Sequence, residues 1–398
     1  MAAKIWYYTL AIASLAGTII GVGMFGLPYT ALQSGFFLTA AYLLVFGVIV
    51  GIMHLLYLEV TLRTQEAHRL TGYTGYYLGE KWKTVTFIQS LISLWGTLLV
   101  YTIVGAQFVL LVAPNLTGVL SETQIGIIFY LVCCLVVFKG DRSVGLQELL
   151  FTIPIVALII IIFVGALASP AFSLDVLTGV QHNNWIGPYG ITLFALVGFS
   201  IIPALEHILE PAKKRGIKVN YPFIVMTGTL LPAVLYVLFV LGVLGVSQQA
   251  TSENALSGLV QPLGNTLTAL GAVLGIFAMY TSFISVGNEL QRTFSEDYKL
   301  NKPISFLGAM LIPFLLYLLN VRNFIAIADV VGALMGGYLG VIMVVLFWKA
   351  KAHGTVTPPF SVQMSRAWGY AFIAIFVFAS LYAFTTYLAP LFSTSFAA

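Results

Sequence analysis

Charge is what this sequence has least of. Only 8% of its residues are Asp, Glu, Lys or Arg, against about 25% in a typical soluble domain. Hydrophobic residues make up 60% of the chain. A soluble protein of 398 residues needs a far more polar surface than this composition supplies, so we expect a membrane protein with no soluble domain.

Cysteine is almost absent. Cys133 and Cys134 are the only two, and they are adjacent within an apolar run. Neighbours of this kind rarely pair or chelate, so we expect no disulfide, no metal site and no cofactor. A cleavable signal peptide is not expected either, because the first apolar stretch is too long and lacks a small-residue cleavage site before a soluble domain.

Long apolar runs are plentiful. Each covers about 18 residues or more, which is enough to cross a hydrocarbon core about 30 Å thick. We count eleven, and the fourth and ninth are the shortest. They cover residues 6–30, 35–62, 85–112, 122–138, 146–167, 188–209, 221–246, 263–290, 304–319, 323–348 and 367–391. We therefore interpret residues 1–398 as one transmembrane domain.

The basic residues test this count, because short cytoplasmic loops retain Lys and Arg. With the amino terminus inside, every one of the 18 basic residues except Arg322 falls on the inner side. A miscounted span would scramble that alternation. The pattern places the carboxyl terminus outside, in what is most simply the plasma (inner) membrane. The longest polar stretch, residues 63–83, then lies inside, either as an amphipathic helix on the membrane surface or as an ordinary loop.

Two short motifs suggest nucleotide or nucleic-acid binding, and neither fits. Residues 21–26 read GVGMFG, a match to G-x-G-x-x-G. A dinucleotide-binding fold also needs an acidic residue about 20 positions later, yet the first carboxylate in the chain is Glu59. The basic stretch LEPAKKRGIK is better explained as a cytoplasmic loop. We expect no nucleic-acid partner.

Glycine and proline interrupt two spans at matching places. The first contains Gly23-Met-Phe-Gly-Leu-Pro28 and the sixth contains Gly198-Phe-Ser-Ile-Ile-Pro203. Because proline removes a backbone donor and glycine tolerates open backbone, each span can break into two half-helices. The alternative for either span alone is close helix packing.

The two interrupted spans lie five apart, so they cross in opposite directions. Residues of about 6–168 and 186–348 then form inverted repeats, followed by an extra helix at 367–391. Interrupted helices at corresponding positions of inverted repeats are typical of secondary transporters, whose substrate binds near the bilayer midplane.

These segments resemble a known family. GTIIGVGMFGLP is similar to the first-helix motif of the amino acid/polyamine/organocation superfamily, and FALVGFSIIPALEHILEPAKKRGIKV is similar to its sixth helix and following loop. The longer run to LPYTALQSG resembles most closely the hydroxy/aromatic amino acid permeases and the amino acid/auxin permease group. The resemblance spans the chain in topology and is specific in spans 1, 6 and 8. It implies an all-α membrane protein with eleven transmembrane helices, a LeuT-type five-plus-five inverted repeat and broken helices 1 and 6. It also implies an aromatic or other large neutral substrate.

A zwitterionic amino acid needs donors for its carboxylate and acceptors for its ammonium, and broken helices offer both. No charged side chain lies at either break, which favours a neutral amino acid. We expect donors from the backbone of Val22, Gly23 and Met24, and acceptors from the carbonyls around Ile19, Phe194, Ala195 and Val197. Candidate side chains for the remaining wall are Trp95, Tyr101, Phe199 and Ser285.

The coupling ion is the next question. Sodium-coupled relatives of this fold hold an ion between the first break and helix 8. The matching groups here are the carbonyls of Gly17, Ile20 and Ala278 and the hydroxyls of Thr281 and Ser282. In several proton-coupled relatives a lysine from helix 5 replaces that ion, and span 5 has no lysine. Sodium is therefore favoured over a proton, although such hydroxyls often bond carbonyls within membrane helices.

Carboxylates within membrane spans are functional candidates by default. Glu206 lies near the inner end of span 6, and Asp329 lies about two turns inside the outer end of span 10. Both are candidates for gating or proton transfer, and Asp329 has the alternative of pairing with Arg322. The two histidines in or near spans, His54 and His207, fit packed polar residues better than ligands.

The sequence thus predicts an ion-coupled symporter of a neutral amino acid that works by alternating access. A proton-coupled permease or exchanger is the alternative, and a metal-ion carrier of the same fold is a more distant one, since those carriers place an acidic residue in the first break. A membrane enzyme would need mid-membrane His, Asp or Cys groups that share a substrate, and the histidines here lie near span ends or in loops, so we do not expect an enzyme. The partners are the amino acid and membrane lipid. Which amino acid is carried, and the oligomeric state, stay open.

Overall fold

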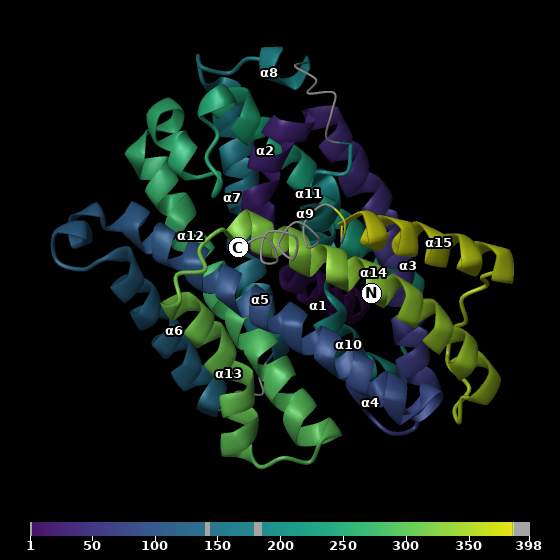
Figure 1. Cartoon of the computed structure of the whole chain (residues 1–398). Coiled ribbons are helices and arrows are strands. Elements are labelled where there is room, and N and C mark those ends of the chain that lie inside the picture. Colours follow the sequence, from purple (N-terminus) through teal and green to yellow (C-terminus); the bar gives the residue numbers. More distant parts are fainter. Residues whose placement is uncertain (1, 140–143, 179–184, 384, 386–398) are drawn as a thin grey trace.

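The computed structural model describes residues 2–139, 144–178, 185–383 and 385, and every regular element in those ranges is helical (Figure 1). The first half contains α1 (Ala2–Ile19), α2 (Gly23–Ser34), α3 (Phe36–Arg63), α4 (Leu70–Leu78), α5 (Glu80–Val112), η1 (Pro114–Gly118), α6 (Glu122–Lys139), α7 (Val144–Ala168) and α8 (Asp175–Thr178). The second half contains α9 (Pro188–Leu196), η2 (Phe199–Ile201), α10 (Ile202–Lys214), α11 (Tyr221–Ser247), η3 (Gln248–Ala250), η4 (Ser257–Leu259), α12 (Val260–Arg292), η5 (Thr293–Asp297), α13 (Lys302–Leu318), α14 (Phe324–His353) and α15 (Arg366–Ala383).

The apolar runs of the sequence become long helices. Seven of the described helical stretches are long and apolar enough to cross a membrane, and α1 with α2 passes the same test as a bent pair. Three shorter apolar helices, at residues 152–168, 302–318 and 366–381, accompany them. The protein is an integral, multi-pass membrane protein. The end of the last predicted span and the carboxyl terminus lie outside the described residues.

Asparagine fixes the start of three of these helices. Asn220, Asn301 and Asn323 precede α11, α13 and α14, and each side chain accepts a hydrogen bond from the backbone N–H three residues later, at 3.0–3.1 Å. A side-chain oxygen at this position satisfies one of the N–H groups that have no partner within the helix. The loop sequence therefore sets where these apolar helices begin.

The polar stretch at residues 63–83 does form a helix, α4, but α4 does not lie free on a surface. Its Thr71, Gly72, Tyr73 and Thr74 are buried, because α4 packs against α5 and α14. Helix formation at this place was predictable from the sequence, whereas its burial was not.

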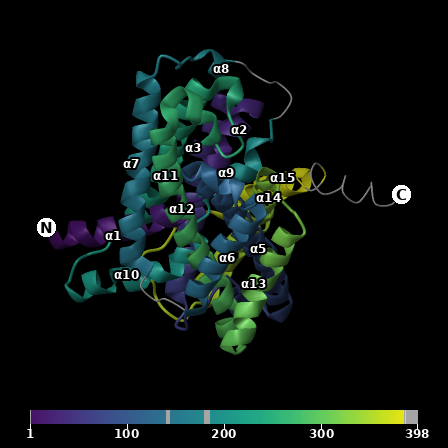
Figure 2. The same cartoon turned by 90° about the vertical axis from the view of Figure 1, so that its left-hand side faces the viewer.

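The helices pack around the two interrupted segments. α3 packs on α11, α5 on α12, and α9 on α14, while α1 packs on α11, α7 and α10. Figure 2 shows α7 and α11 running from top to bottom, with α1 extending sideways to the amino terminus. In both views α8 and α2 lie toward one end of the molecule and α13 toward the other. The end that holds α2 and α8 is called the α2 end below, and the opposite one the α4 end.

Candidate binding site

The first interruption separates α1 from α2. α1 ends at Ile19 and α2 begins at Gly23, and the two axes are bent by 56°. Across the gap, Met24 N–H donates to the Gly21 carbonyl and Phe25 N–H to the Val22 carbonyl. The segment is short, glycine-rich and buried, so its backbone polar groups must find partners within the protein or face a cavity.

The second interruption lies between α9 and α10. Val197 has an extended backbone (φ −75°, ψ 126°) and Gly198 is also non-helical (φ −137°, ψ 33°), before η2 leads into α10. Pro203 is the second residue of α10, a position where its missing N–H has no intrahelical partner to lose.

The two interruptions touch each other, and glycine makes this contact fit. A Cβ at Gly23 would lie 2.7 Å from the Ala195 Cα, and a Cβ at Gly198 would lie 2.7 Å from the Ile19 Cγ1. No real side chain tolerates such distances without a shift of its neighbour. The sequence offered two roles for these glycines, an open backbone at a helix break and close helix packing, and the structure shows that both glycines lie in close packing contacts between the interruptions.

Tyr236 of α11 joins the two interruptions. Its buried hydroxyl donates to the Ile19 carbonyl (2.8 Å) and lies 3.3 Å from the Ala195 carbonyl. A phenol has one hydrogen, so the two carbonyls share it. Two of the predicted acceptors thus have a partner within the protein. Sequence reasoning missed Tyr236 because nothing in the seventh span marks which of its residues faces the breaks.

A cavity of about 120 Å³ lies against both interruptions, several times the space that one water molecule needs. The predicted residues that line it are Ile19, Val22, Gly23, Tyr101, Phe194, Val197 and Phe199. Gly21, Ser200, Tyr57 and Leu339 complete the wall on that side, together with Thr18 and Leu70. Ala195 and Met24 are buried behind it.

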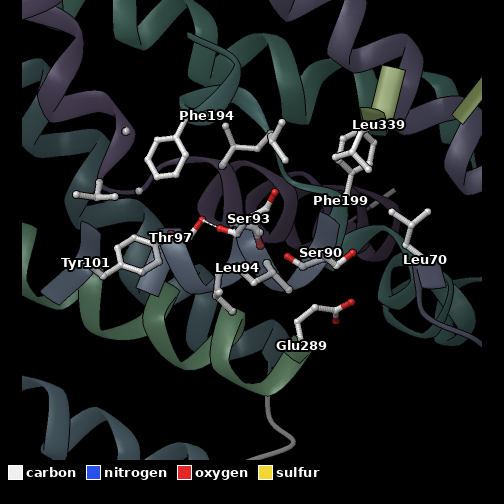
Figure 3. A pocket seen from close by; sticks show the side chains of 18 of the residues that line it. Leu70, Ser90, Ser93, Leu94, Thr97, Tyr101, Phe194, Phe199, Glu289 and Leu339 are labelled. Atoms are coloured by element: carbon white, nitrogen blue, oxygen red, sulfur yellow. Dashed lines mark hydrogen bonds between the residues drawn. The ribbon is translucent and has the colours of Figure 1, made fainter. Parts of the chain in front are cut away.

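The opposite wall is one polar face of α5. It carries Gln89, Ser90, Ser93 and Thr97, followed by Tyr101 one turn further on. Figure 3 shows Ser90, Ser93 and Thr97 between the rings of Phe194 and Phe199 on one side and Glu289 on the other. Gln89 donates to the Ser93 hydroxyl (3.0 Å), and Thr97 donates to the Ser93 carbonyl (2.8 Å). The cavity is therefore hydroxyl-rich on one side and apolar on the other.

The predicted ion-site residues lie on two helices. Thr281 donates to the Ala278 carbonyl (3.0 Å), and the hydroxyls of Ser282 and Tyr101 both lie beside Gly21. Gly17 and Ile20 belong to α1 and to the first interruption, and the Ile20 N–H donates to Ala16. α1 and α12 pack mainly on other helices.

Two other predicted wall residues lie elsewhere. Trp95 donates its indole N–H to the Gly308 carbonyl on α13 (3.1 Å). It is not among the described residues that line the cavity. Ser285 lines a second, smaller cavity of about 50 Å³ with Arg69 and Arg292. Ser200 and Glu289 line both cavities, so the path from the first cavity leads toward the α4 end.

Aromatic rings pack against one another just beyond the first interruption, around Phe25 of α2. Phe25 packs edge-on against Phe108 and Phe239, with ring centroids 4.8 and 5.9 Å apart. Nearby, α9 packs tightly on α14, with glycine at the closest points of both helices. Asp329 of α14 accepts the Ile191 N–H (2.8 Å) from the first turn of α9, where an anion also interacts favourably with the helix dipole.

The contacts of Arg322 bear on one of the roles considered for Asp329. Arg322 donates to Thr123 (3.0 Å) and lies over the Tyr317 ring, so the ion pair between Asp329 and Arg322 is wrong. The free amides at the start of α9 are the better partner for a buried carboxylate, because they satisfy it without a second buried charge.

An ion pair stands at the α4 end. Arg69, which precedes α4, binds Glu289 of α12 at 2.9 Å, with only 12% and 16% of the two side chains exposed. The Glu289 carboxylate raises the pKa of Arg69 above its ordinary value. Glu296 (3.4 Å to Arg69) and Asp297, which accepts the Gly72 N–H (3.0 Å), add two more links between α4 and the end of α12.

The other carboxylates near helix ends anchor loops. Glu206 binds Lys213 and accepts from the Tyr221 hydroxyl (2.8 Å). Glu59, fully buried, accepts from Arg63 (2.8 Å) and from the backbone of Val362 (2.5 Å) in the loop after α14. These contacts favour loop anchoring as the role of both carboxylates.

Comparison with known proteins agrees with this geometry. The profile of the tryptophan/tyrosine permease family matches residues 4–386. The chain belongs to this family. It is an amino acid permease of the amino acid/polyamine/organocation superfamily, as its sequence motifs predicted. A curated relative, glutamine transporter 2 of Aliivibrio fischeri (strain ATCC 700601 / ES114), is 22% identical over 338 residues, which is 83% of this permease and 84% of that protein.

Two solved structures share the fold of the permease. MhsT in complex with L-phenylalanine matches with a TM-score of 0.59 over 94% of this chain and 97% of its own. Mhp1, a nucleobase-cation-symport-1 family transporter in a closed conformation with bromovinylhydantoin bound, matches with a TM-score of 0.63 over 96% and 93%. Both are 13% identical to this chain. The likeness establishes the LeuT-type fold and leaves the substrate to other arguments.

Proposed function

We propose that this permease carries a neutral amino acid across the membrane by alternating access and that a sodium ion drives the transport. The observation that carries the proposal is the meeting of two helix interruptions at one cavity. Backbone donors at the start of α2 and carbonyls at the end of α9 flank the same space, which suits the carboxylate and the ammonium of an amino acid.

The cavity wall supports a neutral substrate. Glu289 is the one carboxylate among its described lining residues, and Arg69 pairs with it. The apolar side formed by Phe194, Phe199 and Val197 would receive the substrate side chain, while the hydroxyls of α5 offer hydrogen bonds to its polar end. The family description favours an aromatic substrate, and the curated relative is a glutamine transporter. Tryptophan, tyrosine and glutamine are all neutral amino acids.

The proposed architecture is eleven spans with two inverted repeats of five. Seven long helices, the bent pair of α1 and α2, and three shorter apolar helices supply the spans. With the amino terminus inside, the α4 end is cytoplasmic, and the described cavity faces the cytoplasm while its outer side is closed. Residues 6–168 and 186–348 would form the repeats, with α15 as the extra helix.

Sodium is proposed to bind Gly17, Ile20, Ala278, Thr281 and Ser282. Thr281 already donates its hydrogen to the Ala278 carbonyl, which leaves the hydroxyl lone pairs for a cation. The groups from α1 and α12 would come together when α1 approaches α12. A proton carried by Asp329 or Glu206 is the alternative, and the contacts of both carboxylates with neighbouring groups make sodium the better candidate.

Uptake by the purified permease in liposomes tests the proposal. We expect one or more neutral amino acids, with aromatic ones first, to accumulate under an inward sodium gradient. Replacing sodium with choline at fixed pH, or Thr281→Ala, should each reduce uptake. Lack of uptake and of competition for every neutral amino acid would refute the function. Uptake that ignores sodium and Thr281 but collapses with a protonophore would assign the coupling to a proton.

A further inference from the structure

The backbone N–H of Gly198 belongs to neither half of the interrupted helix. α9 ends at Leu196, and the N–H of Val197 still donates back to Leu193. The next N–H, that of Gly198, donates instead to the Nε2 atom of His54 on α3, at 3.2 Å. A side chain from another helix thus takes up an N–H that would otherwise be unpaired within the membrane, where an unpaired donor is costly.

The hydrogen bonds of His54 fix its tautomer. Because Gly198 donates to Nε2, that nitrogen carries no proton and the neutral ring must hold its proton on Nδ1. Nδ1 lies 3.0 Å from the Thr229 hydroxyl on α11, and that hydroxyl donates onward to the Val225 carbonyl (3.0 Å). Every donor in the chain has one acceptor, so the direction of the chain is defined.

The ring also touches the cavity wall. His54 is fully buried and packs edge-on against Phe199, with ring centroids 4.7 Å apart, and Phe199 lines the cavity. His54 therefore contacts the interruption twice, once through the Gly198 N–H and once through the neighbouring aromatic ring. α3 and α11 pack closely on each other, so the anchor rests on a rigid pair of helices.

We propose that His54 is a positioning residue for the substrate site. It holds the backbone of the second interruption at one conformation, and this sets where the Val197 carbonyl and the Phe199 ring stand. The inference rests on the proposed function of that site. It does not require His54 to touch the substrate or to change its charge.

Two substitutions separate positioning from simple packing. Gln offers a carbonyl oxygen for the Gly198 N–H and an amide hydrogen for Thr229, whereas Leu fills the space and offers neither. We expect His54→Leu to raise the KM for the transported amino acid by at least about 10-fold, because a buried N–H loses its acceptor, and His54→Gln to stay within about 3-fold of the wild type. His207→Leu, at an exposed position on α10, is the matched control and should leave KM unchanged.

Nitrogen-15 NMR of histidine-labelled permease tests the anchor without any need for transport. The five histidines give separate ring signals, and the signal that is lost in His54→Gln identifies this one. We expect a protonated Nδ1 and a bare Nε2. A proton on Nε2, a wild-type KM in His54→Leu, or equal damage by Leu and Gln would overturn the inference. If the wild type itself carries no amino acid, the proposed function fails, while the NMR result still decides whether His54 anchors Gly198.

Discussion

At the scale of single residues, Gly23 shows how little space separates the two interruptions. Its position next to the Ala195 backbone means that even one methyl group must push the interruptions apart. Gly271 lies in the middle of α12. A Cβ added there would lie 3.5 Å from the nearest atom, which is an ordinary van der Waals contact. The difference that matters for an added methyl group is the space around each glycine.

We predict that Gly23→Ala lowers uptake by at least about 10-fold, because overpacking costs about 1–3 kcal/mol and displaces the groups that bind substrate. Gly271→Ala should transport normally. Initial rates in liposomes, normalised to the amount of folded protein, measure both. Normal uptake by Gly23→Ala would show that the close approach of the interruptions is not needed.

Asp329 provides a second prediction for a single residue. Its carboxylate joins α14 to the first turn of α9 by accepting the Ile191 N–H, and in the proposed orientation this contact holds the outer side closed. Asp329→Ala removes the acceptor, at a cost of about 1.5–3 kcal/mol for a hydrogen bond to a charged group, so the outer side should open more often. Asp329→Asn keeps an acceptor and should have a smaller effect. A cysteine at Ser90 in the cavity should react faster with a reagent added outside in the Ala variant than in the Asn variant. Equal labelling rates in both variants would show that the hydrogen bond from Ile191 to Asp329 does not hold the outer side closed.

At the scale of elements, the link between α4 and α12 depends on the largely buried pair of Arg69 and Glu289. Removing Arg69 leaves the Glu289 carboxylate without this partner, and removing Glu289 leaves Arg69 with only the more exposed Glu296, so each single substitution by Met should lower the free energy of unfolding by about 2–3 kcal/mol. The double substitution should recover at least half of that loss. Thermal unfolding in detergent measures the effect. Lys214→Met, in the exposed pair with Glu210, is the control and should not change the unfolding temperature. Additive losses in the double variant would mean that the pair does not act as a unit.

Local sequence predicted the elements well where the cause is local. Glycine with proline in the interrupted spans predicted helix ends by backbone chemistry alone, and the asparagine caps such as Asn220 before α11 are a local signal of the same kind that the structure added. Tyr236 and His54 could not be assigned in this way. Their partners lie more than 40 and 140 positions away in the chain, and only the packing of α11 and α3 on the interruptions brings them together.

At the scale of the whole molecule, the distribution of basic residues predicts the orientation. Val119, 80% exposed in the loop between α5 and α6, should lie outside, and Lys214 should lie inside. In a chain whose two buried cysteines are replaced by alanine, a cysteine at Val119 should react with an impermeant reagent added to intact cells, and one at Lys214 should not. The reverse pattern would invert the proposed topology and place the closed side of the cavity in the cytoplasm.

The overall fold was predictable because the signals that define it are repeated many times along the chain. Apolar length and basic loops each recur, so a miscounted span would be exposed by the basic loops that follow it. The orientation of Trp95 had no such support. The sequence alone does not show whether an aromatic residue in this span points into the cavity or, as here, toward α13. The polar face of α5 was likewise visible only once the cavity defined its direction.

The central claim is that one cavity, flanked by both interruptions, binds the amino acid and opens to each side in turn. The most direct test is the reactivity of a cysteine at Ser90 in liposomes of known orientation. The account predicts that the transported amino acid slows its labelling from the α4 end, and that sodium without amino acid shifts labelling toward the opposite side. A cysteine at Val119 should be indifferent to both additions. Labelling at Ser90 that neither the amino acid nor sodium changes would contradict the claim.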